Sequence, residues 1–179
     1  MRKTILLLLF SIAVNSFAQT ELTTTSGMIN FEASVPLYEE VKATNKTVSC
    51  VLNTKNGEFT STVLMKDFRF KLSLMEEHFN KKYLETDHYP NAYFKGTIEG
   101  FNWNIIGTTP KAFKLKGALK IHGKTKKITT VVFLKKQENG LEIISDFNLK
   151  TKDFDVEIPE ILSVKVAETV IIKTSFWVQ

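Results

Sequence analysis

The sequence predicts an all-β protein, an antiparallel β-barrel of about eight strands with one or two short helices. Apolar and polar residues alternate with a period of two from Gly27 almost to the end of the chain, as in strands with one buried face. Tight turn sequences separate several of these stretches, and no regular succession of strand and helix indicates a parallel sheet. A β-sandwich fits the same pattern, but we favour the barrel.

The N-terminal residues have the layout of a cleaved secretory signal. Arg2 and Lys3 precede an apolar run over 5–14, and the small residue Ala18 stands before Gln19. The run is too short to span a hydrocarbon core, and no Cys follows it to carry a lipid. We therefore expect a periplasmic or secreted protein without a transmembrane anchor after cleavage.

The expected division is a signal peptide over residues 1–18 and a single domain over 19–179. Removing the signal takes away two basic residues and no acidic one, so the net charge falls from +5 to +3. The lysines are scattered along the domain, and the one tight group is Lys124, Lys126 and Lys127. Nucleic-acid binding is not expected, because it requires a denser basic face.

The clearest alternating stretches follow one another along the whole domain. They lie near 28–33, 47–52, 59–65, 92–98, 113–121, 141–150 and 162–178. In the last stretch Val170, Ile172 and Phe176 share one face, while Lys165 and Lys173 share the other. We expect the apolar faces to point into the barrel.

Two tight turns and one interruption punctuate these strands. The sequences 55–58, with Asn-Gly at its centre, and 138–140, which reads Glu-Asn-Gly, predict hairpins between antiparallel neighbours. Over 59–65 most apolar residues have odd numbers, whereas Phe68 and Phe70, which follow, have even numbers. A bulge or a strand break near Lys66 accounts for this change.

Two segments depart from the strand pattern and are expected to be helical. Residues 36–42 begin with a proline and have room for about two turns. The second segment has apolar residues at helical spacing and ends before Asp87; these residues are Leu72, Met75, Phe79 and Tyr83. Its adjacent carboxylates, Glu76 and Glu77, diverge on a helix, so salt bridges are expected, including one from Glu77 to Lys81.

The residue types that usually carry catalysis or bind metals form no recognisable motif. His78, His88 and His122 lie at no spacing that places two ligands on one element, so each is expected to make a structural hydrogen bond. The sequence has no Gly-x-Ser-x-Gly, phosphate-binding glycine-rich or Cys-x-x-Cys motif. The lone Cys50 is expected to be a small buried residue. We expect no enzyme activity, cofactor or metal, although a histidine metal site assembled from distant positions stays open.

Aromatic residues accumulate in the middle of the chain. They are Phe68, Phe70, Phe79, Tyr83, Tyr89, Tyr93, Phe94 and Phe101. Each fits either core packing or the wall of a cavity. Arg69 lies between two of them, where it can turn to solvent or pair with an anionic head group at a cavity rim.

Several strings of residues also occur together in a known family. Three of them are Met-Lys-Asp-Phe-Arg-Phe-Lys at 65–71, Leu-Met-Glu-Glu-His-Phe-Asn at 74–80 and Tyr-Pro-Asn-Ala-Tyr-Phe-Lys-Gly at 89–96. Two more are Gly-Ala-Leu-Lys-Ile-His-Gly-Lys-Thr-Lys at 117–126 and Lys-Asp-Phe at 152–154, the latter followed by Ile-Pro. In content and order they resemble the YceI-like family of small exported proteins that bind polyisoprenoids and related lipids.

The resemblance implies a lipocalin-like antiparallel barrel with an elongated apolar interior and a helix near one opening. By position it implies ligand-contacting residues at Phe68, Phe70, Phe79, Tyr83, Phe94 and Phe154. It also implies head-group contacts at Arg69, His78 and His88.

These observations favour a protein that binds a long apolar ligand inside the barrel. The expected partner is a polyisoprenoid, an isoprenoid quinone or a similar lipid, and assembly into a homodimer is compatible with the sequence. One alternative is a non-catalytic interaction protein whose barrel is filled by its own side chains. Another is an enzyme that acts on an apolar substrate through a histidine-bound metal.

Overall fold

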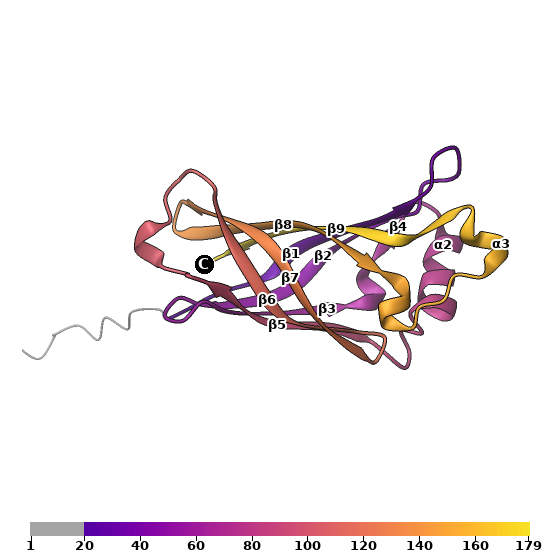
Figure 1. Cartoon of the computed structure of the whole chain (residues 1–179), viewed down its shortest axis with the longest axis horizontal. Coiled ribbons are helices and arrows are strands. Elements are labelled where there is room, and N and C mark those ends of the chain that lie inside the picture. The colour runs from indigo at the N-terminus through magenta and orange to yellow at the C-terminus, as the bar shows by residue number, and fades with distance from the viewer. Residues whose placement is uncertain (1–19) are drawn as a thin grey trace, which may run out of the picture.

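A closed ring of antiparallel strands makes up most of the part of the chain that the computed structural model describes, residues 20–179 (Figure 1). The strand order is β1-β9-β8-β7-β6-β5-β3-β2, and pairing of β1 with β2 closes the ring. The short strand β4 pairs with Ala43 and Thr44 of β2, on the same edge of β2 that β3 pairs with further along. The predicted antiparallel barrel is confirmed, whereas the expected signal peptide over 1–18 lies outside the described residues.

The strands and helices alternate along the chain as follows. The strands are β1 Glu21–Ser34, β2 Lys42–Asn53, β3 Glu58–Leu64, β4 Arg69–Phe70, β5 Asn91–Glu99, β6 Lys111–Ile121, β7 Lys124–Gln137, β8 Gly140–Lys150 and β9 Val166–Val178. The helices are α2 Ser73–His78 and α3 Glu160–Ser163. Shorter helical turns are η2 Met65–Asp67, η3 Phe79–Tyr83, η4 Trp103–Ile105 and η5 Thr151–Phe154. Figure 1 shows α2 and α3 at the same end of the barrel, which we call the helical end.

Period-two alternation along the strands separates the inside of the barrel from the outside. In β3, for example, Phe59, Ser61 and Val63 are buried, while Thr62 and Leu64 between and beyond them are exposed. Side chains of successive strand residues point to opposite faces, so each strand contributes every second residue to the interior.

The end of the barrel opposite the helices is filled by its own side chains. Leu52, Leu134, Leu141 and Val178 are completely buried there, and Ile98 is 1% exposed. Burying one such side chain contributes about 1.5–3 kcal/mol of hydrophobic free energy. This filled end supplies a solid core from which the strands extend toward the helices.

Both predicted hairpin turns are present. The turn after β2 leads to β3 through Gly57, whose φ of 72° favours glycine. The turn between β7 and β8 joins Gln137 to Gly140, which are paired in register. These turns confirm the antiparallel neighbours that the sequence indicated.

The expected helix over 36–42 is wrong. These residues form a turn that connects β1 to β2, and a hydrogen bond of 2.8 Å from Ala33 N to Val41 O closes it. Leu37 at its tip has a φ of 73° and is fully exposed. The pairing of β1 with β2 on both sides of the segment determines its conformation.

Two strand predictions also require correction. The last strand begins at Val166 and not at residue 162, because Glu160–Ser163 form the short helix α3. Strand β7 was not predicted, although it pairs with β6 from Lys111 to Ile121. Its apolar residues lie on both faces: Val132 is buried whereas Phe133 is 46% exposed, so the alternation is hidden in the sequence.

The predicted strand break and the second helix are confirmed. The turn η2 interrupts the chain between β3 and β4, and α2 follows. The helix continues into the π-helical turn η3 and ends before Asp87. Lys81 Nζ lies 2.9 Å from Glu77 Oε1, which confirms that predicted ion pair.

Candidate functional site

A cavity of about 410 Å³ occupies the helical half of the barrel. Its wall is formed by the inward-facing residues of the strands together with side chains from α2, η3 and α3. Leu52, Leu134, Leu141 and Val178 of the filled end are not among the described residues that line it. The barrel is therefore solid at one end and hollow at the other, and the hollow has the volume of a small-molecule site.

Four phenylalanine rings pack together beneath α2. Phe31 of β1 stacks on Phe79 with ring centroids 5.5 Å apart and an angle of 17° between the planes. Phe68 and Phe70 meet Phe79 at 5.6 Å and 5.2 Å. All four rings line the cavity. Together they form an aromatic surface suited to contact with an apolar ligand.

Three other rings mark the deep end of the cavity. Phe59 lies 5.7 Å from Phe176 and 6.2 Å from Phe94 between ring centroids. Gly96 and Gly117, which are paired in register, leave room for the Phe94 ring. A Cβ added at either glycine would lie only 2.5–2.6 Å from Phe94 Cζ. The ring lies over this pair of glycines and forms a floor between the cavity and the filled end.

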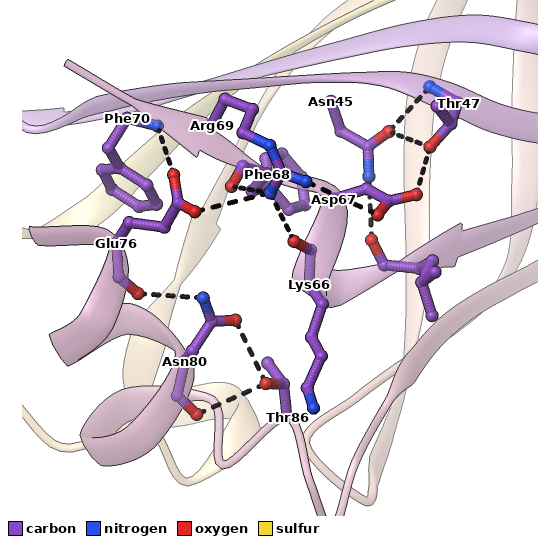
Figure 2. Close-up of polar contacts among 11 residues, drawn as sticks. Asn45, Thr47, Lys66, Asp67, Phe68, Arg69, Phe70, Glu76, Asn80 and Thr86 are labelled. Atoms are coloured by element: carbon purple, nitrogen blue, oxygen red, sulfur yellow. Dashed lines mark hydrogen bonds and ion pairs between the residues drawn. The ribbon is translucent and has the colours of Figure 1, made fainter. Parts of the chain in front are cut away.

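The strand break that directs Phe68 inward is held by a buried asparagine (Figure 2). Asn45 is completely buried, and its Nδ2 donates a hydrogen bond of 2.9 Å to Leu64 O, the last residue of β3. Its Oδ1 accepts one of 2.9 Å from Thr47 N. The Thr47 hydroxyl in turn donates to Asp67 Oδ2 at 2.6 Å. These bonds fix β2, the end of β3 and η2 to one another.

A second set of contacts in Figure 2 ties α2 to the strand β4. Glu76 Oε2 accepts a hydrogen bond of 3.2 Å from Phe70 N, and Glu76 Oε1 lies 3.4 Å from Arg69 Nη1. The same Arg69 nitrogen donates to Lys66 O at 2.6 Å. The predicted salt bridge of Glu76 is thereby confirmed, and it places Phe70 beside Phe79.

The loop after η3 is closed by one polar pair. Thr86, which is 1% exposed, donates from its backbone N to Asn80 O at 2.9 Å and from its hydroxyl to Asn80 Oδ1 at 3.1 Å. Asn80 Nδ2 donates to Glu76 O at 3.0 Å. The π-helical turn that carries Phe79 and Tyr83 is thus fixed on both sides.

Charged residues of the lining are confined to exposed positions. They are Glu39, Lys150 and Lys165, which come from the turn before β2, the end of β8 and the segment before β9. All three are exposed, and they belong to segments at the helical end. His78 of α2 is half-buried and lines the same cavity. The opening therefore has a charged rim, while the interior is apolar except for a few hydroxyl groups.

A model of the YceI-like domain matches residues 16–177 of the chain. The chain belongs to the YceI-like family. The predicted family resemblance is confirmed. No curated protein matches the chain at a significant level.

Solved structures resemble this YceI-like chain in fold. A polyisoprenoid-binding domain from Saccharophagus degradans, implicated in plant cell wall breakdown, has a TM-score of 0.77 at 13% identity over 89% of this chain and 98% of that one. BcnA of Burkholderia cenocepacia has a TM-score of 0.70 at 17% identity over 86% and 96%. The YCEI protein of Campylobacter jejuni has a TM-score of 0.60 at 14% identity over 80% and 88%.

Most of the site residues predicted from the sequence line the cavity of this YceI-like chain. These are Phe68, Phe70, His78, Phe79, Tyr83, Phe94 and Phe154. Arg69 and His88 are not among the described lining residues. Arg69 instead bonds to backbone carbonyls and to Glu76, and His88 is exposed on the loop before β5. A head-group role for these two residues stays a prediction.

Other lining residues were not singled out as site residues from the sequence. Phe31, Phe59, Phe147, Leu149 and Ile172 all line the cavity. Period-two alternation identifies such residues as inward-facing. It does not distinguish a residue beside a cavity from one in the filled end, because both kinds are apolar and face inward.

His122 makes structural hydrogen bonds, as expected from the sequence. Its Nε2 lies 2.9 Å from Glu85 Oε2, and its Nδ1 lies 3.1 Å from Phe154 O. Its ring also packs against Tyr89, with centroids 4.6 Å apart. These contacts join the β6–β7 hairpin to the loop before β5 and to η5, which carries the lining residue Phe154.

Two other kinds of feature are absent from residues 20–179. In this part of the chain no three His, Cys, Asp or Glu side chains gather closely enough to hold a metal ion. Every helix in the same part falls short of the length and apolar character needed to cross a bilayer. Cys50 is 2% exposed, as expected, and burial raises the pKa of its thiol to about 12.

Proposed function

We propose that this YceI-like protein is exported and binds a polyisoprenoid, an isoprenoid quinone or a similar long apolar molecule inside its barrel, without catalysing a reaction. The observation that carries the proposal is the apolar cavity of about 410 Å³ at the helical end. A hollow of this kind favours a carrier over an interaction protein with a filled barrel. The fold shared with the polyisoprenoid-binding domain from Saccharophagus degradans supports the same ligand class.

Burial of apolar surface is the source of the proposed affinity. At about 25 cal/mol per Å², a chain that removes a few hundred Å² from water gains several kcal/mol. The loss of translational and conformational freedom on binding subtracts from this gain. The rings of Phe31, Phe68, Phe70 and Phe79 supply much of the contact surface near the opening.

Export is the second part of the proposal, and it depends on the signal layout of residues 1–18. A periplasmic or secreted carrier meets its lipids in a watery compartment, where an apolar ligand needs a closed interior. Secretion of the full chain, followed by N-terminal sequencing of the mature protein, tests this part independently of ligand binding. A retained, uncleaved chain contradicts it.

A pair of adjacent substitutions in β9 tests ligand binding. Val170 lines the cavity, whereas the next residue, Ile171, is 38% exposed on the outside of the barrel. Val170→Trp is expected to fill part of the cavity. It should lower the affinity for geranylgeraniol, a polyisoprenoid alcohol, at least tenfold, a change of about 1.4 kcal/mol in binding free energy. Ile171→Trp adds the same side chain to the outer face and is expected to bind as the wild type does.

Native mass spectrometry of the three proteins with added geranylgeraniol provides the measurement. Circular dichroism and thermal unfolding establish that both variants are folded. Equal binding by folded Val170→Trp and Ile171→Trp contradicts a ligand inside the barrel. Failure of the wild type to bind any polyisoprenoid alcohol or quinone contradicts the proposed function itself.

A further inference from the structure

Four hydroxyl side chains interrupt the apolar wall at one level of the cavity. They are Ser61 of β3, Thr130 of β7, Ser145 of β8 and Thr174 of β9, and all of them line the cavity. We call this set the hydroxyl belt. Ser145 and Thr174 are direct partners in the β8–β9 register, and β3 lies on the opposite side of the ring from β8.

The hydroxyl belt lies just above the aromatic floor. Strand β3 runs toward the helical end, so Ser61 is one inward-facing position closer to the opening than Phe59. Strand β9 runs the other way, and Thr174 is likewise one position closer to the opening than Phe176. A ligand that reaches the bottom of the cavity therefore ends beside the belt.

Two members of the hydroxyl belt already have partners in the protein. Ser145 Oγ donates a hydrogen bond of 2.7 Å to Val131 O, and Thr130 Oγ1 lies 3.3 Å from Ser145 Oγ. These bonds hold the β7–β8 side of the belt in place. They also leave the Thr130 and Ser145 oxygens with lone pairs that can accept from a ligand.

The other two members have no hydrogen-bond partner among the described residues. Ser61 and Thr174 are each only 8% exposed. Their hydroxyl oxygens are not sealed inside the protein, because no fully enclosed side-chain oxygen or nitrogen in the described chain lacks a partner. Both hydroxyl groups therefore open onto the cavity. A buried hydroxyl without a partner is unfavourable, so these groups favour an occupant that hydrogen-bonds with them.

The charge of the occupant at this depth follows from the lining. The charged lining residues Glu39, Lys150 and Lys165 are exposed ones on segments at the helical end, and the belt contributes only neutral hydroxyl groups. A phosphate or ammonium group placed at the belt would have no opposite charge beside it in this part of the chain. Desolvating such a group without a partner is costly.

We propose that the hydroxyl belt binds the uncharged, oxygen-bearing end group of the ligand, a hydroxyl or a carbonyl, and that the ligand enters this end first. The hydrocarbon tail then runs past Phe31, Phe68 and Phe79 toward the opening. This inference rests on the proposed function and adds to it the class of end group and the direction of insertion.

Two probes with the same skeleton test the role of the belt. One is geranylgeraniol, and the other is the hydrocarbon that lacks only its hydroxyl group. The wild type is expected to prefer the alcohol about tenfold, the effect of one well-formed buried hydrogen bond. The double variant Ser61→Ala, Thr174→Val is expected to lose that preference while binding the hydrocarbon at least as well. Competition between the probes in native mass spectrometry gives the ratio directly.

A control and a stability measurement separate binding from folding. Thr62→Val removes an exposed hydroxyl next to Ser61 on the outer face and is expected to keep the preference. The ligand-free double variant is expected to melt no lower than the wild type, since it loses two hydroxyl groups without partners. A lower melting temperature would show that the hydroxyls have a structural role and would overturn the inference.

The remaining outcomes distinguish this inference from the proposed function. A wild type that binds both probes equally, or a double variant that still prefers the alcohol, overturns the belt and leaves the carrier intact. A wild type that binds neither these probes nor any other polyisoprenoid alcohol or quinone overturns both. The belt is supported if the double variant loses the preference for the alcohol while the wild type and Thr62→Val keep it.

Discussion

At the scale of single residues, Asn45 holds the strand break that directs Phe68 into the cavity. The register between β1 and β2 shifts at this point, so the backbone of β2 departs from the regular ladder. The Asn45 side chain bonds with two backbone groups, Leu64 O and Thr47 N. A buried asparagine is tolerated here because its polar atoms have partners in the protein.

Replacing Asn45 with alanine is expected to lower the free energy of unfolding by about 1–3 kcal/mol, because Leu64 O and Thr47 N each lose a part-buried hydrogen bond. Asn148→Ala, on the exposed face of β8, is the control and is expected to change stability by less than about 0.5 kcal/mol. Urea denaturation followed by fluorescence or circular dichroism measures both values. Similar small effects for the two variants would contradict the role of Asn45.

Cys50 illustrates how burial controls reactivity at the same scale. With the pKa of its thiol raised to about 12, about one molecule in ten thousand carries the thiolate at pH 8. The native protein is therefore expected to be inert to Ellman's reagent, and the protein unfolded in guanidinium is expected to release one equivalent of the coloured product. Rapid reaction of the native protein would show that this part of β2 opens to solvent.

At the scale of elements, α2 is attached to the barrel mainly by its polar contacts and by the ring that follows it. None of its own residues is buried, whereas Phe79 directly after it is 7% exposed. Glu76 accepts a hydrogen bond from the backbone of β4, while Glu77 pairs with exposed Lys81 on the helix surface. Glu76 therefore links the helix to the barrel, whereas the Glu77 pair lies within the helical segment itself.

Glu76→Ala is expected to speed hydrogen exchange across residues 72–84, because α2 loses its link to Phe70 N and Arg69. Glu77→Ala removes one exposed, solvent-screened ion pair on the helix surface and is expected to leave this exchange nearly unchanged. Exchange followed by mass spectrometry compares the two variants on the same peptide. Equal rates would show that Glu76 does not anchor the helix.

The elements also show which parts of the structure could be predicted from sequence. Alternation predicted most strands, and the change of apolar positions near Lys66 predicted the break that turns Phe68 inward. Strand β7 was missed because Val131 and Phe133 place apolar groups on its outer face. The helix over 36–42 was predicted from proline and local composition, but strand pairing on either side outweighs that local preference.

At the scale of the whole molecule, the division into a filled end and a hollow end is the feature on which function depends. Inward-facing Leu134 and inward-facing Ile172 are equivalent in the sequence pattern, yet one is in the solid core and the other lines the cavity. The difference arises from how all the strands and the helices close around them. Asn45 was missed for a similar reason, since its partners come from segments far apart in the sequence.

The most direct test of the carrier proposal is to purify the protein from its own exported fraction and to identify what organic solvent extracts from it. We predict about one equivalent of an apolar lipid, with an isoprenoid chain and an uncharged oxygen-bearing end group. A protein that is empty on extraction and that also takes up no added polyprenol or quinone would contradict the account.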